Sequence, residues 1–193
     1  TAVPYPTPIP TATPIPTPTP APIPASFSLT PKEDCNPIKT QHVQLVQLRT
    51  ESGEAAAGNS VEWFINRFPD AVGDIVSLSG LEPDKVDNFY AVAGTDEKGE
   101  TRLTITATRP GDTDVTALVP GIADQNIHKQ FAVKHWLDLT AEFPGDATNL
   151  VGTEHAFSVK AITVSNGAPV EGVPVRWTII DGPPAHFREG GAG

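Results

Sequence analysis

From Ser26 onward, apolar and polar residues alternate in short runs that are separated by turn residues. The clearest run is Val61, Trp63 and Ile65, which alternates with Glu62 and Phe64. A period of two residues is typical of a strand with one buried face. Similar runs predict strands around residues 27–29, 43–48, 61–65, 75–78, 89–92, 103–107, 115–119 and 128–136, with an irregularity at 45–46 and a loop at 31–37. Because no segment shows a helical period, these short strands and their Gly, Pro and Asp turns predict an all-β fold, an antiparallel β-sandwich.

The segment Gly53–Pro69 recurs at Gly167–Pro183, at a constant offset of 114 residues and without a gap. Six positions are identical in the two copies: Gly53/Gly167, Gly58/Gly172, Val61/Val175, Trp63/Trp177, Ile65/Ile179 and Pro69/Pro183. This period exceeds the roughly 20–50 residues of a solenoid repeat and fits a whole domain used twice. We therefore predict that Trp63 and Trp177 pack in equivalent cores, and that Gly58 and Gly172 have equivalent structural roles.

The repeat also sets the domain boundaries. Residues 137–140 (LDLT) align with residues 27–30 (FSLT) of the first copy, so the second copy begins at Leu137. We predict an extended stalk at 1–25, an immunoglobulin-like sandwich at 26–136, and the start of a second, incomplete one at 137–193. Half a sandwich leaves a sheet face and strand edges uncovered, so we expect the polypeptide to continue or another chain to supply the missing strands. The link between the copies is almost zero residues long, which favours end-to-end stacking with limited bending.

Residues 1–25 have low complexity, with proline at nearly every even position from Pro4 to Pro24. Each proline fixes its own φ and restricts the residue before it, which predicts an extended polyproline-II segment of about 75 Å at about 3.1 Å per residue. Two interpretations of its threonines stay open: a bare stiff linker, or a glycosylated stalk. The candidate acceptors are Thr7, Thr11, Thr13, Thr17 and Thr19. A third interpretation is a ligand for an aromatic groove on another protein.

Charge and cysteine content narrow the partners and the compartment. The chain has 13 basic and 23 acidic residues and a net charge of -10, which argues against a nucleic-acid partner and against docking on an anionic membrane. No apolar run approaches the roughly 18–20 residues of a membrane helix, so we predict no membrane insertion within this segment. Cys35 is the single cysteine. A domain of about 110 residues can bury enough core without a disulfide, and this is compatible with a bacterial extracellular protein.

Candidate sites for chemistry are few. Asp112, Asp114, Asp96 and Glu97 are weak calcium candidates, because hard cations prefer several oxygens together. They lack the spacing of a calcium loop, and Asp and Gly are also ordinary turn residues. Trp136 lies at the domain junction, where it is either an interdomain wedge or an exposed aromatic that contacts a glycan. No metal-binding histidine spacing and no nucleophile motif is present, so we predict no catalytic residue and no cofactor.

Three stretches, taken in order, resemble a known family. They are Gly53–Ile65, a turn followed by V-x-W-x-I; Thr95–Gly99, a T-D-x-x-G turn before a threonine-rich strand; and Pro110–Ala117, which reads P-G-D-x-D-V-T-A. This order resembles the bacterial immunoglobulin-like domains of invasin- and intimin-type adhesins, over about residues 26–193. The resemblance implies Greek-key β-sandwiches used in tandem as a stalk or display module on bacterial surfaces. It implies no catalytic residues.

We therefore expect a non-enzymatic structural protein located at the cell surface or outside the cell. It would be a spacer or assembly module of an adhesin, sheath, filament or surface layer, and its partners would be other copies or subunits. A second hypothesis is an accessory module of a secreted polysaccharide-active enzyme, which a catalytic domain in the full-length protein would favour. A third is a module that binds surface polysaccharide, for which Trp136 and Tyr90 are the aromatic residues to test.

Overall fold

The computed structural model describes residues 20–66, 72–182 and 184–187. The strands within these ranges are β1 (Ser26–Thr30), β2 (Glu33–Pro37), β3 (Gln41–Arg49), β4 (Ser60–Ile65), β5 (Asp74–Ser79), β6 (Leu81–Lys85), β7 (Tyr90–Gly94), β8 (Glu100–Thr106), β9 (Gly111–Leu118), β10 (Lys129–Leu137), β11 (Thr140–Glu142) and β12 (Lys160–Ile162). The all-β class predicted from the alternation is confirmed. In this part of the chain, no helix is long and apolar enough to cross a membrane.

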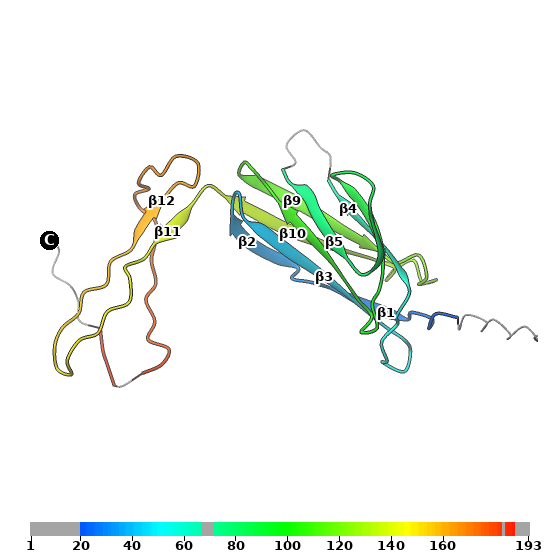
Figure 1. The fold of residues 1–193 in the computed structure, drawn as a ribbon, viewed down its shortest axis with the longest axis horizontal. Coiled ribbons are helices and arrows are strands. Elements are labelled where there is room, and N and C mark those ends of the chain that lie inside the picture. Colours follow the sequence, from blue (N-terminus) through cyan, green and yellow to red (C-terminus); the bar gives the residue numbers. More distant parts are fainter. Residues whose placement is uncertain (1–19, 67–71, 183, 188–193) are drawn as a thin grey trace, which may run out of the picture.

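Strands β1 to β10 form a sandwich of two sheets (Figure 1). One sheet has the order β1-β3-β8-β5, and the other has the order β2-β10-β9-β4-β7-β6. The chain enters in the first sheet as β1, passes through a cis Thr30–Pro31 bond, and continues as β2 in the second sheet. The pairing is antiparallel except between β2 and β10, which are parallel from Glu33↔Val133 to Pro37↔Leu137. The predicted sandwich therefore contains one parallel pair, made by its second and last strands.

The core lies between the two sheets and comes from the alternating positions of the strands. Trp63 is fully buried, together with Val61 and Ile65 of the same strand, as the period-two pattern predicts. The inward positions of β8 and β9 and the residue after each strand are buried in the same way: Leu103, Ile105, Ala107, Val115, Ala117 and Val119. Burying a large apolar side chain stabilises a fold by roughly 1.5–3 kcal/mol, so these rows are a main source of its stability.

Strand β3 differs from the prediction in the face that it buries. The sequence analysis used Val43, Leu45 and Leu48 to predict this strand, with an irregularity at 45–46. The strand is instead regular, and its buried residues are His42, Gln44, Val46 and Leu48. Its register explains this, because Val46 pairs with Leu29 and Leu48 pairs with Phe27 across to β1. These pairs determine which face of β3 points inward. Because side chains alternate along a strand, His42 and Gln44 point to that same inward face.

Two strands were missed by the sequence analysis. Strand β2 lies in the expected loop at 31–37, and β6 precedes β7 at the edge of the six-stranded sheet. Neither strand has a fully buried residue, and both contain proline. Their positions are set by backbone pairing with β10 and β7, and this pairing leaves no apolar period in the sequence.

The glycines of the repeat have equivalent backbone conformations in both copies. Gly58 has φ 73° and Gly172 has φ 74°, and their repeat partners Gly53 and Gly167 have φ 84° and 73°. Residues with a Cβ rarely adopt this left-handed region, whereas glycine adopts it readily. The turn that precedes the V-x-W-x-I stretch is therefore built in the same way twice.

The second copy differs from the first in its strands and its burial. Among its described residues, 138–182 and 184–187, only β11 and β12 are formed, and they pair with each other. Trp177 is 41% exposed, whereas Trp63 is 0% exposed. The expected core position of Trp177 is thus not buried, because no second sheet faces it within the described ranges. A complete second domain stays a prediction.

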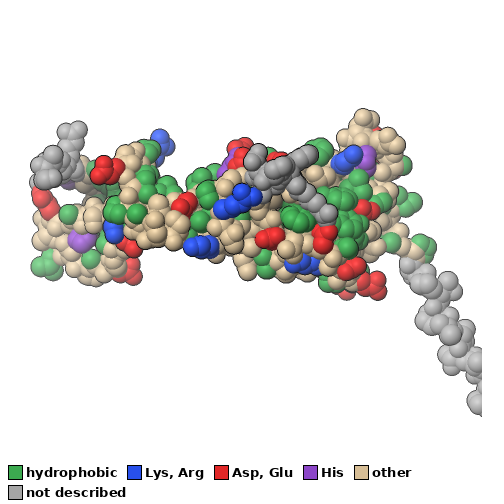
Figure 2. All heavy atoms as spheres, turned by 90° about the horizontal axis from the view of Figure 1, so that it is seen from above, with side chains coloured by type: hydrophobic (Ala, Val, Ile, Leu, Met, Phe, Trp, Pro, Cys, Tyr) green, Lys and Arg blue, Asp and Glu red, His purple; other side chains and the backbone are tan. Residues whose placement is uncertain are grey.

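Charged side chains of both signs share the surface, and the last residues of the stalk contact the sandwich. On the face seen in Figure 2, lysine and arginine side chains lie apart from one another among acidic ones. The five threonines proposed as glycan acceptors (Thr7, Thr11, Thr13, Thr17 and Thr19) and the two prolines of the repeat (Pro69 and Pro183) lie outside the described residues. Of the stalk, residues 20–25 are described, and Asn59 Nδ2 donates to the Pro22 carbonyl at 2.8 Å.

Candidate functional site on the outer face of the six-stranded sheet

An aromatic row crosses four strands on the solvent face of the six-stranded sheet. The register places Phe131 of β10 opposite Thr116 of β9, Thr116 opposite Phe64 of β4, and Phe64 opposite Tyr90 of β7. Phe131 is 65% exposed and Phe64 is 38% exposed. The rings of Phe64 and Tyr90 stack with their centroids 4.8 Å apart. A group of large apolar side chains on the solvent face of a sheet is typical of a contact site.

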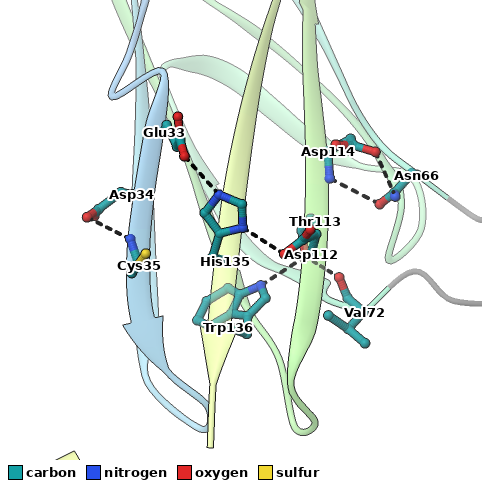
Figure 3. A network of polar contacts seen from close by, with 10 residues as sticks. All are labelled: Glu33, Asp34, Cys35, Asn66, Val72, Asp112, Thr113, Asp114, His135 and Trp136. Atoms are coloured by element: carbon teal, nitrogen blue, oxygen red, sulfur yellow. Dashed lines mark hydrogen bonds and ion pairs between the residues drawn. The ribbon is translucent and has the colours of Figure 1, made fainter. Parts of the chain in front are cut away.

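A shallow cleft of about 360 Å³ lies in this row. Phe64 and Phe131 line it together with Thr116, and Asn66 and Asp114 add polar groups. Asn66 Nδ2 donates to Asp114 Oδ2 at 3.1 Å, and the Asp114 backbone N–H donates to Asn66 Oδ1 at 3.2 Å (Figure 3). The two side chains therefore hold each other in place beside the apolar surface.

The opposite side of the row ends in a tyrosine with a carboxylate partner. The hydroxyl of Tyr90 donates to Glu62 Oε2 at 3.2 Å. Burial and the neighbouring Glu62 carboxylate raise the pKa of Tyr90, so the phenol stays protonated at neutral pH. The row thus has carboxylate oxygens on two sides, from Asp114 and from Glu62.

A second group of polar side chains lies nearby on β2, β10 and β9 (Figure 3). His135 projects between two carboxylates, with its Nδ1 2.7 Å from Asp112 Oδ1 and its Nε2 3.2 Å from Glu33 Oε1. The hydrogen bond with Asp112, followed by the one with Glu33, raises the pKa of His135. These three side chains connect neighbouring strands across the outside of the β2–β10–β9 region.

Trp136 is buried in the core and is not an exposed glycan contact. Its side chain is 1% exposed and points into the sandwich core. The indole Nε1–H donates to Thr113 Oγ1 at 2.9 Å, and the Thr113 hydroxyl donates to the Val72 carbonyl. The expectation was wrong because residue 136 continues the inward phase of β10, which extends one residue beyond it. Of the two aromatics proposed for glycan contact, only Tyr90 lies on the surface row.

The four calcium candidates do not meet at one point. Asp96 lies before β8, where its Oδ1 accepts the backbone N–H groups of Lys98 and Glu100, which is ordinary turn chemistry. Asp112 and Asp114 lie after β8, on β9, and Glu97 is an exposed turn residue. Across the described residues, no group of three or more His, Cys, Asp and Glu side chains could hold a metal ion.

Sequence reasoning proposed neither Phe64 nor Phe131 as a site residue, although a signal for them was present. Phe64 alternates with the inward Trp63 and Ile65, and Phe131 lies in a predicted strand. The alternation assigns Phe64 to the solvent face, where a large aromatic side chain is unusual. The register that brings the two residues into one row depends on strand pairing, which the sequence pattern does not contain.

His42 and His135 make the free energy of unfolding depend on pH in opposite directions. Burial, and then the nearby Lys134 ammonium, lower the pKa of His42. A lowered histidine pKa contributes stability that is present above the ordinary pKa of about 6.5 and is lost as pH falls through the folded pKa. The raised pKa of His135 contributes stability that is fully present below about 6.5 and is lost as pH rises through the folded pKa.

We predict that His135→Gln lowers the stability below about pH 6.5 and flattens its decline above that pH, because it removes only the group with the raised pKa, while the loss toward acid pH that His42 causes keeps its slope. Urea unfolding between about pH 5 and 8 measures this, with His155→Gln as the matched control on an exposed histidine. An unchanged decline above neutral pH in His135→Gln would mean that another group causes it.

Comparison with known proteins adds structural similarity only. No family model and no curated protein matches the sequence. The chain is similar to the D00-D0 domain of intimin (16% identity, TM-score 0.39, covering 58% of this chain and 46% of that one). It is also similar to domains 4 and 5 of the S-layer protein SbsC (13% identity, TM-score 0.42, 60% and 53%) and to AggA, the major subunit of aggregative adherence fimbriae type I from Escherichia coli (12% identity, TM-score 0.36, 58% and 93%). The chain thus spans about half the length of the first two. These structures include an adhesin of the type that the sequence resembles, but with TM-scores below 0.5 the sandwich assignment rests on this chain's own strand order.

Proposed function

We propose that this chain is a non-enzymatic structural module of a cell-surface assembly such as an adhesin, sheath, filament or surface layer. Its partners would be other copies or subunits of that assembly, and residues 1–25 would act as a spacer. The observation that supports this proposal most directly is the parallel pairing of β2 with β10. The proposed role is mechanical, namely to transmit tension along the chain without unfolding.

The pairing of β2 with β10 suits a load applied at the two ends of the domain. The chain enters at one end of the sandwich before β1 and leaves β10 at the other end (Figure 1). Tension would therefore pull β2 by its first residue and β10 by its last residue, in opposite directions. Because the strands are parallel, their hydrogen bonds share the load at the same time. Two of these contacts are Val133 N–H to the Lys32 carbonyl and Ile38 N–H to the Leu137 carbonyl, each at 2.9 Å.

We predict that the force needed to unfold the sandwich depends on where it is applied. End-to-end loading shears the β2–β10 pair, whereas loading between cysteines placed at Glu82 and Glu97, at the Leu81↔Gly94 end of the β6–β7 pair, peels β6 from β7, one contact after another. Single-molecule force spectroscopy on the same domain, in a Cys35→Ser background, measures both geometries. We expect end-to-end unfolding to need a force several-fold higher.

The two geometries use the same fold, so a difference in thermodynamic stability cannot produce the expected effect. A cysteine-free chain loaded through its terminal handles gives the reference value. Equal unfolding forces in both geometries would contradict the proposed mechanical role.

A second candidate function is contact with a neutral polysaccharide, as in a carbohydrate-binding or accessory module of a secreted polysaccharide-active enzyme. The aromatic row of Phe131, Phe64 and Tyr90 favours it, because exposed aromatic rings can pack against the C–H faces of sugar rings. The cleft beside it adds the Asn66 amide and the Asp114 carboxylate.

The polar groups around the row favour a ligand that donates hydrogen bonds and carries no negative charge. The carboxylates of Glu62 and Asp114 flank the row, and those of Asp112 and Glu33 lie further along the sheet. A carboxylate only accepts hydrogen bonds, and sugar hydroxyls can donate them. An anionic glycan would instead be repelled by these like charges.

We predict that Phe131→Ala lowers the retention of the chain on insoluble neutral glycans by about 10- to 150-fold, since one buried aromatic contact contributes roughly 1.5–3 kcal/mol. Pull-down on cellulose, chitin and mixed-linkage glucan measures this. Val43→Ala removes an exposed apolar side chain from the other sheet and should leave retention unchanged. Absence of retention in the unmodified chain, or equal retention in Phe131→Ala, would contradict this function.

A further inference from the structure

One lysine lies inside the sandwich. The inward residues of β10 are Ala132, Lys134 and Trp136, and Lys134 is 0% exposed. Its Nζ lies 2.6 Å from Asn36 Oδ1 and 3.0 Å from Asp34 Oδ2, and 5.8 Å from the centroid of the Trp136 ring. Lysine is almost never fully buried unless it is paired, so this arrangement calls for a specific reason.

The side-chain amide of Asn36 is held with its carbonyl toward this lysine. Asn36 Nδ2 donates to Thr40 Oγ1 and to the Gln41 carbonyl, both at 3.2 Å. These bonds fix the amide nitrogen on the far side of the group. The carbonyl oxygen therefore faces the amine of Lys134.

The carboxylate of Asp34 completes the group. Its Oδ2 contacts Lys134 Nζ and lies 3.4 Å from His42 Nδ1, and its Oδ1 accepts the Cys35 backbone N–H at 2.8 Å. The hydrogen bond from Lys134 lowers the pKa of Asp34, so this carboxyl is ionised at neutral pH, and its distance of 3.0 Å from Nζ places it to accept a proton. The amine of Lys134 thus lies within hydrogen-bond distance of both an amide carbonyl and a base.

We propose that Lys134 and Asn36 form an intramolecular isopeptide bond. Asp34 takes one proton from the Lys134 ammonium, and the free electron pair on Nζ attacks Cγ of Asn36 to form a C–N bond. The second Nζ proton and the proton on Asp34 pass to the former amide nitrogen as the Cγ–Nδ2 bond breaks. The products are a secondary amide and one ammonium ion, and Asp34 returns to its carboxylate form. The step needs no oxidant and no other reactant.

Two features of the site favour this reaction over a simple ion pair. Reactive groups that are held together by a fold react as if at very high concentration, because no entropy is lost in bringing them together. The burial of Lys134 beside Trp136 also limits the approach of water from the core side, although the Asp34 carboxylate is 47% exposed. Loss of ammonia into solvent then makes the reverse reaction negligible.

The bond would join the same two strands that we propose to carry the load. In the parallel register, Asp34 lies opposite Lys134 and Asn36 lies opposite Trp136. A covalent link between these neighbours would lock β2 to β10. A disulfide within the chain cannot do this, because Cys35 is the only cysteine. This inference goes beyond the proposed function, and its test does not depend on that function.

Intact-mass measurement of the purified, fully denatured chain tests the proposal. We expect the mass to be lower than the sequence mass by one ammonia molecule, and we expect a proteolytic map to contain a branched peptide that joins the β2 and β10 segments through Lys134 and Asn36. Lys134→Arg and Asn36→Ala should restore the full sequence mass, and Asp34→Ala should slow or abolish the loss. The control Lys129→Arg, on the exposed start of β10, should keep the reduced mass.

The result does not depend on whether a variant folds, because the branched peptide is sought in the unmodified chain. A full sequence mass without a branched peptide would overturn the proposal. Loss of ammonia without a branched peptide would also overturn it, since a succinimide at an asparagine has the same mass. If the bond is absent and unfolding still depends on the direction of force, the mechanical role stands and this inference fails. If the bond is present, the force measurement is repeated on the Lys134→Arg variant, which cannot form it, and equal forces in both geometries there would count against the mechanical role and leave this inference standing.

Discussion

The parallel contact between β2 and β10 is the constraint on which the rest of the structure depends. It fixes β2, the second strand of the domain, against the last strand β10, and so determines that the chain must leave the four-stranded sheet after β1. It also places Asp34 and Asn36 of β2 next to the one lysine that points into the core. The core cluster, the polar network around His135 and the path of force all meet at this pair of strands.

Most of the fold could be predicted from the sequence, because it depends on alternation. The pattern at Val61, Trp63 and Ile65 predicts a half-buried strand, and the structure buries all three residues. The same reasoning failed for β2, which contains EDCNP and no apolar period. Backbone pairing with a strand almost a hundred residues away positions β2, and no local pattern of side chains encodes that pairing.

The candidate sites were harder to predict than the fold, for a physical reason. Trp136 was expected at a surface because it lies close to a domain boundary, but β10 continues through it and keeps its indole in the core. The aromatic row joins four strands that are far apart in the sequence, and its existence depends on their register. His42, Gln44 and Lys134 are polar, so a sequence pattern assigns them to the surface. Their burial becomes apparent only when strand pairing shows which face of each strand points inward.

Amide hydrogen exchange at the β2–β10 contact tests the central claim most directly. If this pair is a fixed part of the sandwich, the Val133 and Ile38 amides, which donate across it, will exchange as slowly as those of the β9–β10 ladder. Exchange of these two amides at the rate of the exposed edge strand β6 would contradict the account, since β2 would then open without the rest of the domain.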